Sequence, residues 1–296
     1  MITTSVLINN YNNGAYLKAC VESALDQTQP ADEVIVYDDG STDESLAILR
    51  TFLPRIILIE GARTNLPSRT AQARASYEAF RRSHGKLVFL LDGDDRFHRE
   101  KIEIYARAFG TEPNAVLVQA PLREIDGTGR PLGTNHNPMK HKDDYLAATY
   151  QLHDVDFYYP TSALAFSRRF LEATLPLDYS DGIQLSIDTR LGMLAPLYGK
   201  IISLETDYSD WRRHSHSHSI QPGRYSVQLF PTLQRTRVFN RFCQKHNLRK
   251  ISLWRNRRFY LQLLRLLTPK LFYSLYYHWT RLSPASIRQT EYRRAK

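Results

Sequence analysis

Residues 5–45, SVLINNYNNGAYLKACVESALDQTQPADEVIVYDDGSTDES, decide the fold class of this chain. The stretch opens on a short apolar run, Ser5–Asn9, and closes on a second one, Glu33–Tyr37, with apolar residues at helical spacing between them. Short, nearly continuous runs of β-branched and apolar residues are typical of strands buried on both faces of a parallel sheet. The stretch therefore predicts a strand–helix–strand unit.

The same alternation continues along the first half of the chain. Arg55–Glu60 and Lys86–Leu91 are two more apolar runs, and together with the first pair they predict an α/β fold with a doubly wound, mostly parallel sheet. Further on, AVLVQ predicts a strand, DGTGRPLGTNHNP a hairpin, and IDTRLGMLAPLYGKIISLE a helix, a stop at Gly199 and a strand. WRRHSHSHSIQPG has the composition of a loop, and helical patterns follow it to the end.

Polar clusters follow three of the predicted strands: NNYNN, DDGSTD and DGDD. The last belongs to FLLDGDDRF (Phe89–Phe97), where three acids stand around one glycine after a buried run. Like charges repel and carboxylates resist desolvation, and a cation that takes hard oxygen ligands would relieve both. A solvated acidic turn is the alternative. Because ligands of such sheets bind at the carboxyl ends of the strands, three clusters on one edge favour a ligand or metal site.

The charge of the chain is concentrated in its last part. The net charge is +10, and residues 251–296 contain ten basic residues and one acid, which makes that part +9. The basic and aromatic composition leaves a nucleic-acid-binding protein open as an alternative, although strand-end acids would repel phosphate. Two cysteines provide no disulfide framework, and no secretory signal pattern is present at the start, so we expect a cytoplasmic location.

Four motifs together resemble the inverting family 2 glycosyltransferases of GT-A fold. Residues 5–45 follow that family's opening pattern, FLLDGDDRF resembles its Asp-x-Asp segment, SIDTRLGMLAPLYGK its later Glu-Asp segment, and WRRHSHSHS its Tyr-Arg-x-His loop. The resemblance implies a Rossmann-like GT-A domain with a C-terminal helical extension. It also implies metal-dependent, inverting transfer of a sugar from a nucleotide-diphosphate sugar, usually a UDP-sugar, to an acceptor hydroxyl, in polysaccharide or glycoconjugate synthesis.

The resemblance assigns the nucleotide site to the first two strand ends. Asn9 and Tyr11 would line the base pocket, with the Tyr11 ring against the uracil, and Asp39 would accept a hydrogen bond from the base N–H. The alternative for Asp38 and Asp39 is a turn that caps the next helix.

The resemblance assigns the metal to the third strand end. Asp92 would approach the ribose or the donor and join Asp94 in binding Mn²⁺ or Mg²⁺, while Asp95 would orient its neighbours. Carboxylates are the usual protein ligands of these ions. A metal that bridges the two phosphates would stabilise the diphosphate leaving group.

Asp188 is the candidate general base for the acceptor hydroxyl. The alternative is an acid at a helix start that the helix dipole favours. The sequence departs from the family pattern at two places: Ile187 replaces the usual Glu before Asp188, and Gln72 with Ala73 replaces an Arg-Asn pair. Arg69 or Arg74 is the candidate to supply the missing cation near the phosphates. These departures keep an inactive, glycosyltransferase-like scaffold open as an alternative.

HSHSHS places His214, His216 and His218 at alternate positions. The resemblance favours His214 near the diphosphate or the metal. A three-histidine zinc site and a plain solvated loop are the alternatives.

We expect a glycosyltransferase domain over residues 1–220, with a nucleotide-binding half over about 1–113 and an acceptor-binding half over about 114–220. The acceptor would be a carbohydrate or a lipid-linked molecule, and no nucleic acid is expected as a partner. Residues 221–296 would form a basic, aromatic-rich helical tail. Its arginines and aromatic residues suit an interfacial helix on the cytoplasmic face of an anionic membrane, and packing on the body is the alternative.

Overall fold

The first apolar run forms β1 (Thr4–Asn10), and all seven of its residues are buried in the computed structural model, which describes residues 2–137, 140–214 and 231–267. β2 (Glu33–Asp38) and β4 (Leu87–Asp92) pair with β1 in parallel, one on each side. Asn9 lies opposite Tyr37 on one side and opposite Asp92 on the other. The three polar clusters of the sequence therefore end at the same edge of one sheet.

Seven strands make up this sheet, in the order β10-β6-β9-β4-β1-β2-β3. The remaining members are β3 (Ile57–Glu60), β6 (Ala115–Gln119), β9 (Leu164–Ser167) and β10 (Lys200–Ser203). β9 runs antiparallel to both β4 and β6, and the other pairs are parallel. The predicted doubly wound, mostly parallel sheet is confirmed.

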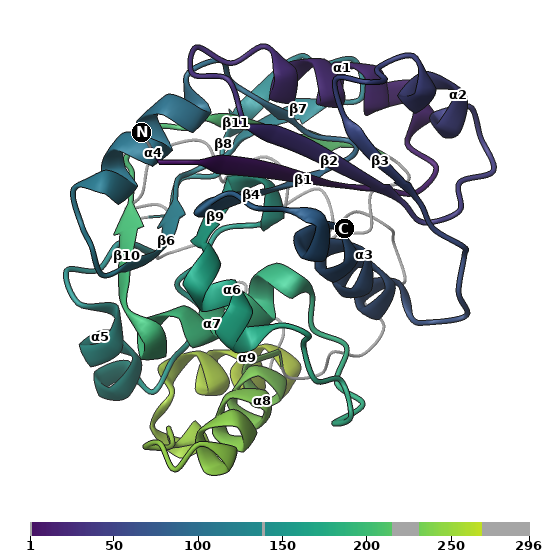
Figure 1. The fold of residues 1–296 in the computed structure, drawn as a ribbon. Helices are drawn as coiled ribbons and strands as arrows, with labels where there is room; N and C mark the ends of the chain where they lie inside the picture. The colour runs from purple at the N-terminus through teal and green to yellow at the C-terminus, as the bar shows by residue number, and fades with distance from the viewer. Residues whose placement is uncertain (1, 138–139, 215–230, 268–296) are drawn as a thin grey trace. The chain divides into compact units, whose positions relative to one another are not determined.

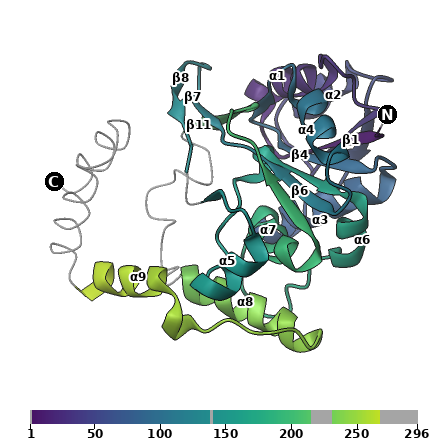
Figure 2. The same cartoon turned by 90° about the vertical axis from the view of Figure 1, so that its left-hand side faces the viewer.

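Helices cover both faces of the sheet (Figures 1 and 2). On one face, apolar residues of α1 (Gly14–Leu25), α2 (Ser45–Arg50) and α4 (Lys101–Gly110) form one core with the strands. α3 (Ser68–Arg82) packs against β1 and β2, and α7 (Ile187–Tyr198) packs against β6 and β10. α6 (Arg168–Thr174) follows β9 and contacts α7. In Figure 1, α3, α6 and α7 lie on the opposite side of the sheet from α1 and α2.

A second sheet has the strand order β5-β11-β7-β8. Its members are β5 (Arg96–Phe97), β7 (Arg123–Asp126), β8 (Pro131–Thr134) and β11 (Ser209–Arg213). β7 and β8 are the predicted hairpin. β5 follows the DGDD cluster directly and pairs with β11, so the end of β11 lies beside that cluster. The prediction of a loop was wrong for residues 211–213, which lie within β11, because a strand of a small sheet tolerates charged residues such as Arg212 and Arg213.

The chain divides into two units, one of residues 1–147 with 155–221 and the other of 148–154 with 222–296. α5 (Tyr145–Leu152) spans the first boundary. The second unit contains α8 (Pro231–Lys245) and α9 (Arg257–Leu267). Within it, the Asn240 side chain exchanges two hydrogen bonds with the Ile251 backbone, at 2.8 and 2.9 Å. None of the helices in the described part of the chain is both long and apolar enough to cross a bilayer.

Candidate active site

The DGDD turn folds back over the end of β1. The Gly93 N–H donates to the Asn9 carbonyl at 2.9 Å. A Cβ at Gly93 would lie 2.8 Å from Asn10 Oδ1 and 3.0 Å from the Asn9 carbonyl oxygen, so any larger residue there would force the Asn10 amide or the turn to shift. This contact holds Asp92 and Asp94 at the edge of the sheet.

Asp92, Asp94 and Asp188 form a group of mutually repelling carboxylates. Burial raises the pKa of Asp92 to about 7, and the charges of Asp94 and Asp188 add to this effect. Gln72 Nε2 donates to Asp92 Oδ1 at 2.9 Å, which partly offsets it. Gln72, which stands where the family has an arginine, thus contacts the acid cluster without neutralising its charge.

Asp94 and Asp95 point to different partners. Asp94 Oδ2 lies 2.9 Å from His214 Nε2, and the imidazole of His214 is itself buried at the end of β11. Asp95 is fully buried and accepts from the Ser162 hydroxyl at 2.5 Å and from the Arg212 N–H at 2.8 Å. One Asp95 oxygen therefore joins the DGDD turn to β11, and the other joins the turn to the short 3-10 helix Thr161–Ala163. His216 and His218 lie outside the described residues.

Asp188 lies in the first turn of α7 and is half-buried. The Thr189 N–H donates to its Oδ1 at 2.7 Å, and among the described residues Oδ2 receives no hydrogen bond. Ile187, which replaces the family's Glu, is buried, so this position anchors the helix through packing. The buried Arg190 donates to Asp181 Oδ1 at 2.8 Å and to the Ile183 carbonyl at 2.6 Å, which fixes the loop before the helix.

The arginines near the ends of β1 and β2 divide into two groups. Arg69 Nη1 donates to the Gln184 carbonyl at 2.7 Å, so its guanidinium contacts the loop before α7. Arg74 Nη2 instead lies 3.1 Å from Asp39 Oδ1. Arg63 Nη1 lies 2.6 Å from Asp39 Oδ2, and its guanidinium covers the Tyr11 ring at 3.9 Å from the ring centroid. Sequence reasoning missed Arg63, because a single arginine after a strand forms no motif.

Asp38 and Asp39 have different hydrogen-bond partners. Asp38 is fully buried and accepts from the Ser41 N–H at 2.8 Å and from Asn10 Nδ2 at 2.7 Å. It therefore holds the turn after β2, while Asp39 faces the two arginines. Asn9 Oδ1 accepts from the Ser76 hydroxyl at 3.1 Å, and among the described residues its buried Nδ2 has no hydrogen-bond partner.

The acid cluster fits a divalent cation. Burial, followed by the charges of Asp94 and Asp188, raises the pKa of Asp92, and a cation would offset these effects. Carboxylate oxygens are the donor atoms that Mg²⁺ and Mn²⁺ take in proteins, with phosphates and water completing the shell. Asp92 and Asp94 have the chemistry of such ligands.

The fold is that of the GT-A glycosyltransferases. It matches the crystal structure of S. aureus TarS 1–349 in complex with UDP-GlcNAc with a TM-score of 0.59 at 17% identity, over 80% of this chain and 65% of that one. It also matches the mannosyltransferase PcManGT from Pyrobaculum calidifontis, in complex with GDP-Man and Mn²⁺, with a TM-score of 0.54 at 15% identity, over 96% of this chain and 76% of that one.

The chain belongs to glycosyl transferase family 2, whose family model matches residues 5–174. An uncharacterised glycosyltransferase of Nostoc sp. is 28% identical over 71% of this chain and 64% of its own length. The chondroitin synthase of Escherichia coli is 33% identical over 45% of this chain and 19% of its own length. The chain thus matches less than two thirds of the length of either relative.

Proposed function

We propose that this chain transfers a sugar from a UDP-sugar to an acceptor hydroxyl with inversion at the anomeric carbon. The observation that carries the proposal is the convergence of Asp39, Asp92 and Asp94 at one sheet edge, with Asp188 close enough to Asp92 to raise its pKa. One edge of the sheet would thereby hold the nucleobase near Asp39 and the diphosphate with its cation near Asp92 and Asp94. Asp188 would be the carboxylate that accepts the proton of the acceptor hydroxyl.

The nucleoside would bind at the ends of β1 and β2. The uracil would pack on the face of the Tyr11 ring that the Arg63 guanidinium does not cover, and it would donate its N–H to Asp39. A carboxylate has about four acceptor positions, and Arg63 and Arg74 use one on each oxygen, so capacity remains for the base. The two arginines would fix the orientation of the carboxylate before the nucleotide arrives.

The reaction would be a single displacement. Asp188 would take the proton of the acceptor hydroxyl, and that oxygen would form a bond to the anomeric carbon. The bond from this carbon to the β-phosphate oxygen would break, and the electron pair would leave with UDP. Entry and departure on opposite faces of the sugar invert the anomeric configuration.

Asp92 and Asp94 would hold the Mn²⁺ or Mg²⁺, with His214 as a buried partner of Asp94. When bound, the cation would supply positive charge beside the diphosphate, where negative charge develops as UDP leaves. The nucleotide-binding half of the domain would be about residues 1–113, and the half from about 114 to 220 would bind the acceptor, a carbohydrate or a lipid-linked molecule.

The names of similar proteins support the substrate class. TarS is described with UDP-GlcNAc and PcManGT with GDP-Man and Mn²⁺. Sequence relatives include chondroitin synthases, a hyaluronan synthase and a putative teichuronic acid biosynthesis glycosyltransferase, TuaG. We therefore place the proposed reaction in polysaccharide or glycoconjugate synthesis.

A panel of nucleotide sugars tests the proposal. Melting temperatures are measured with UDP- and GDP-sugars, with Mn²⁺ and with a chelator, because a ligand that binds only the folded state stabilises it. We expect a UDP-sugar to raise the melting temperature, and we expect this stabilisation to require Mn²⁺. We also expect slow release of UDP, because water can replace the acceptor. A protein that no UDP-sugar stabilises, or that binds one without any UDP release, would contradict it.

A second part of the proposal concerns the membrane. α9 and the segment before it expose Trp254, Tyr260 and Leu261, with Trp254 70% exposed, next to the arginine at the start of the helix. Exposed aromatic and apolar residues beside arginines suit an interfacial helix on anionic lipid. We propose peripheral binding to the cytoplasmic face of a membrane; the predicted tail beyond residue 267 lies outside the described residues.

Sedimentation with phosphatidylserine-containing vesicles tests this part. Trp254→Ser combined with Leu261→Ser should reduce co-sedimentation, and Leu53→Ser, an exposed leucine of the first unit, serves as the matched control. Equal sedimentation of the wild type and the double variant, or equal binding to neutral vesicles, would contradict it.

A further inference from the structure

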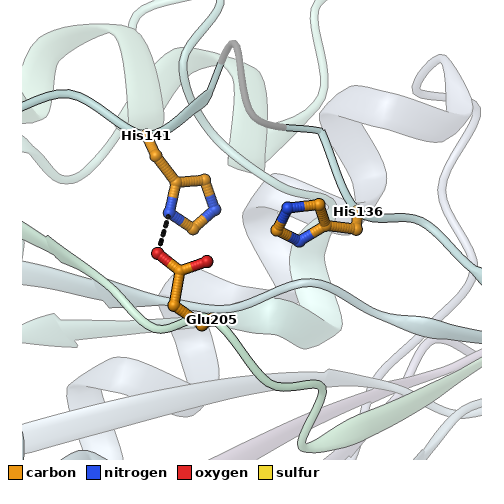
Figure 3. Close-up of side chains that lie close together, drawn as sticks. All are labelled: His136, His141 and Glu205. Carbon is orange, nitrogen blue, oxygen red and sulfur yellow. Dashed lines mark ion pairs between the residues drawn. The ribbon is translucent and has the colours of Figure 1, made fainter. Parts of the chain in front are cut away.

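A cluster of three metal-binding side chains lies outside the residues assigned to transfer. His136 and His141 belong to the loop between β8 and α5, and Glu205 follows β10 (Figure 3). One ligand atom from each lies within 4.8 Å of the others. The two imidazole rings have centroids 5.4 Å apart and converge with the carboxylate in Figure 3. The three come from two segments that are 64 residues apart at their nearest, so the fold alone assembles them.

Backbone and side-chain contacts hold both segments in place. Thr134 Oγ1 donates to Asp207 Oδ2 at 3.0 Å, which joins the end of β8 to the segment of Glu205. The Asn135 N–H donates to the Leu122 carbonyl at 2.7 Å, and the Leu204 N–H donates to the Gln119 carbonyl at 2.8 Å. The two sides of the cluster are therefore fixed within hydrogen-bonded structure.

The hydrogen bonds around His141 leave one ring nitrogen facing the carboxylate. The buried Tyr159 hydroxyl has one proton, which it donates to the Asn137 carbonyl at 3.4 Å, and it lies 3.1 Å from His141 Nε2. A cation at Nδ1 selects the tautomer that carries its proton on Nε2, and the Tyr159 oxygen lies where it can accept a hydrogen bond from that proton. Glu205 Oε1 lies 3.3 Å from this Nδ1.

We propose that His136, His141 and Glu205 bind a Zn²⁺-class transition-metal ion. Zinc takes imidazole nitrogen and carboxylate oxygen at about 2.0–2.1 Å, which gives a tetrahedral ligand–ligand separation of about 3.3–3.4 Å. The His141–Glu205 pair already has this separation. His136 and Glu205 are exposed, and Glu205 is 78% exposed, so both can close the remaining gap by side-chain rotation. Tyr159 would be the outer partner that orients the ligating His141.

The donor set separates this site from the strand-end acids. Two imidazoles and one carboxylate suit Zn²⁺, Co²⁺, Ni²⁺ and Cu²⁺, whereas the oxygen donors of Asp92 and Asp94 suit Mg²⁺ and Mn²⁺. The three protein ligands leave a fourth position for water or for a ligand of the bound ion. The chain would then carry two metal sites of different classes.

Zinc competition with a chromophoric chelator tests the site, in excess Mg²⁺ to occupy the oxygen ligands. We expect His136→Gln and Glu205→Gln, both at exposed positions, to lose one equivalent of bound zinc. Tyr159→Phe should weaken zinc binding by about 10- to 100-fold, because it removes only the outer partner. His84→Gln is the matched control: His84 Nδ1 also lies 3.3 Å from a glutamate oxygen, that of Glu33, but without a second histidine in contact among the described residues.

The histidine run after β11 needs its own control, because it could bind zinc by itself. A His216→Gln/His218→Gln double variant should keep the equivalent that the His136 and Glu205 variants lose. Unchanged zinc stoichiometry and affinity in both His136→Gln and Glu205→Gln would overturn the proposal. Loss of all zinc in the His216/His218 double variant would overturn it as well.

Discussion

Two acidic positions at the same sheet edge differ in how their charge is balanced. Asp39, at the end of β2, has Arg63 and Arg74 within 3.1 Å. Asp92, at the end of β4, accepts from the Gln72 amide, and burial together with the charges of Asp94 and Asp188 raises its pKa to about 7. The chain itself neutralises the first acid, whereas the second has no cationic partner among the described residues. Under the proposed function, this difference separates a site for a neutral nucleobase from a site for a charged diphosphate with its cation.

Replacing the proposed base should have the largest effect. Asp188→Asn keeps the shape and removes the basicity, so transfer should fall by roughly 10² to 10⁴ while UDP affinity stays near that of the wild type. Initial rates of transfer, or of UDP release until an acceptor is known, measure this. Asp144→Asn is the matched control, since Asp144 also lies at a helix start, where it accepts from the Ala147 N–H at 2.9 Å. Wild-type transfer by the Asp188 variant would leave that residue as a helix-start acid only.

Replacing the neutralised acid should change affinity without changing metal dependence. Asp39→Asn removes a charged acceptor for the base N–H, which is worth about 1.5–3 kcal/mol, or roughly 10- to 100-fold in UDP affinity. Calorimetry with UDP and with UMP should show the same loss, because both carry the uracil. If Mn²⁺ dependence vanished together with affinity, the division of labour between the two acids would be wrong.

Asp210 is a third acid whose charge is balanced by neighbouring residues, and its contribution to the free energy of unfolding can be measured. Burial alone would raise the pKa of Asp210, but hydrogen bonds from His98, Arg123 and Arg96 hold it well below its usual range. A carboxyl whose folded pKa is depressed stabilises the fold above its unfolded pKa of about 3.9, and this stability is lost as the pH falls.

Asp210→Asn should therefore lower the free energy of unfolding by about 1–3 kcal/mol at pH 7. The difference from the wild type should shrink below about pH 4, where the wild-type carboxyl of the unfolded chain is protonated. Urea unfolding at several pH values measures both. A difference that grew toward acid pH would contradict the assignment.

The first half of the fold can be predicted from the sequence more completely than the second half. β1, β2 and β4 are uninterrupted apolar runs, so their burial between neighbours was predictable from composition. β9 has four residues within an aromatic-rich stretch, and only its pairing with β4 and β6 makes it a strand. Local patterns do not encode such tertiary pairings.

The candidate site divides in the same way. Asp39, Asp92 and Asp94 stand directly after predicted strands, so their meeting at one edge follows from strand geometry. Arg63 and Gln72 become partners of these acids only through the folded positions of β3 and α3. The proximity of His136 and His141 to Glu205 likewise depends on the small sheet that brings β8 beside the segment after β10. No spacing in the sequence points to it.

UDP binding with and without Mn²⁺ tests the central claim, that the unbalanced acids hold a cation for the diphosphate. Calorimetry is performed on the wild type and on Asp94→Asn, with Asp144→Asn as the control for a lost carboxylate. We expect Mn²⁺ to tighten UDP binding to the wild type and to the control, and we expect Asp94→Asn to bind UDP equally weakly with and without the ion. An Asp94→Asn variant whose UDP affinity still rises with Mn²⁺ as in the wild type would contradict it.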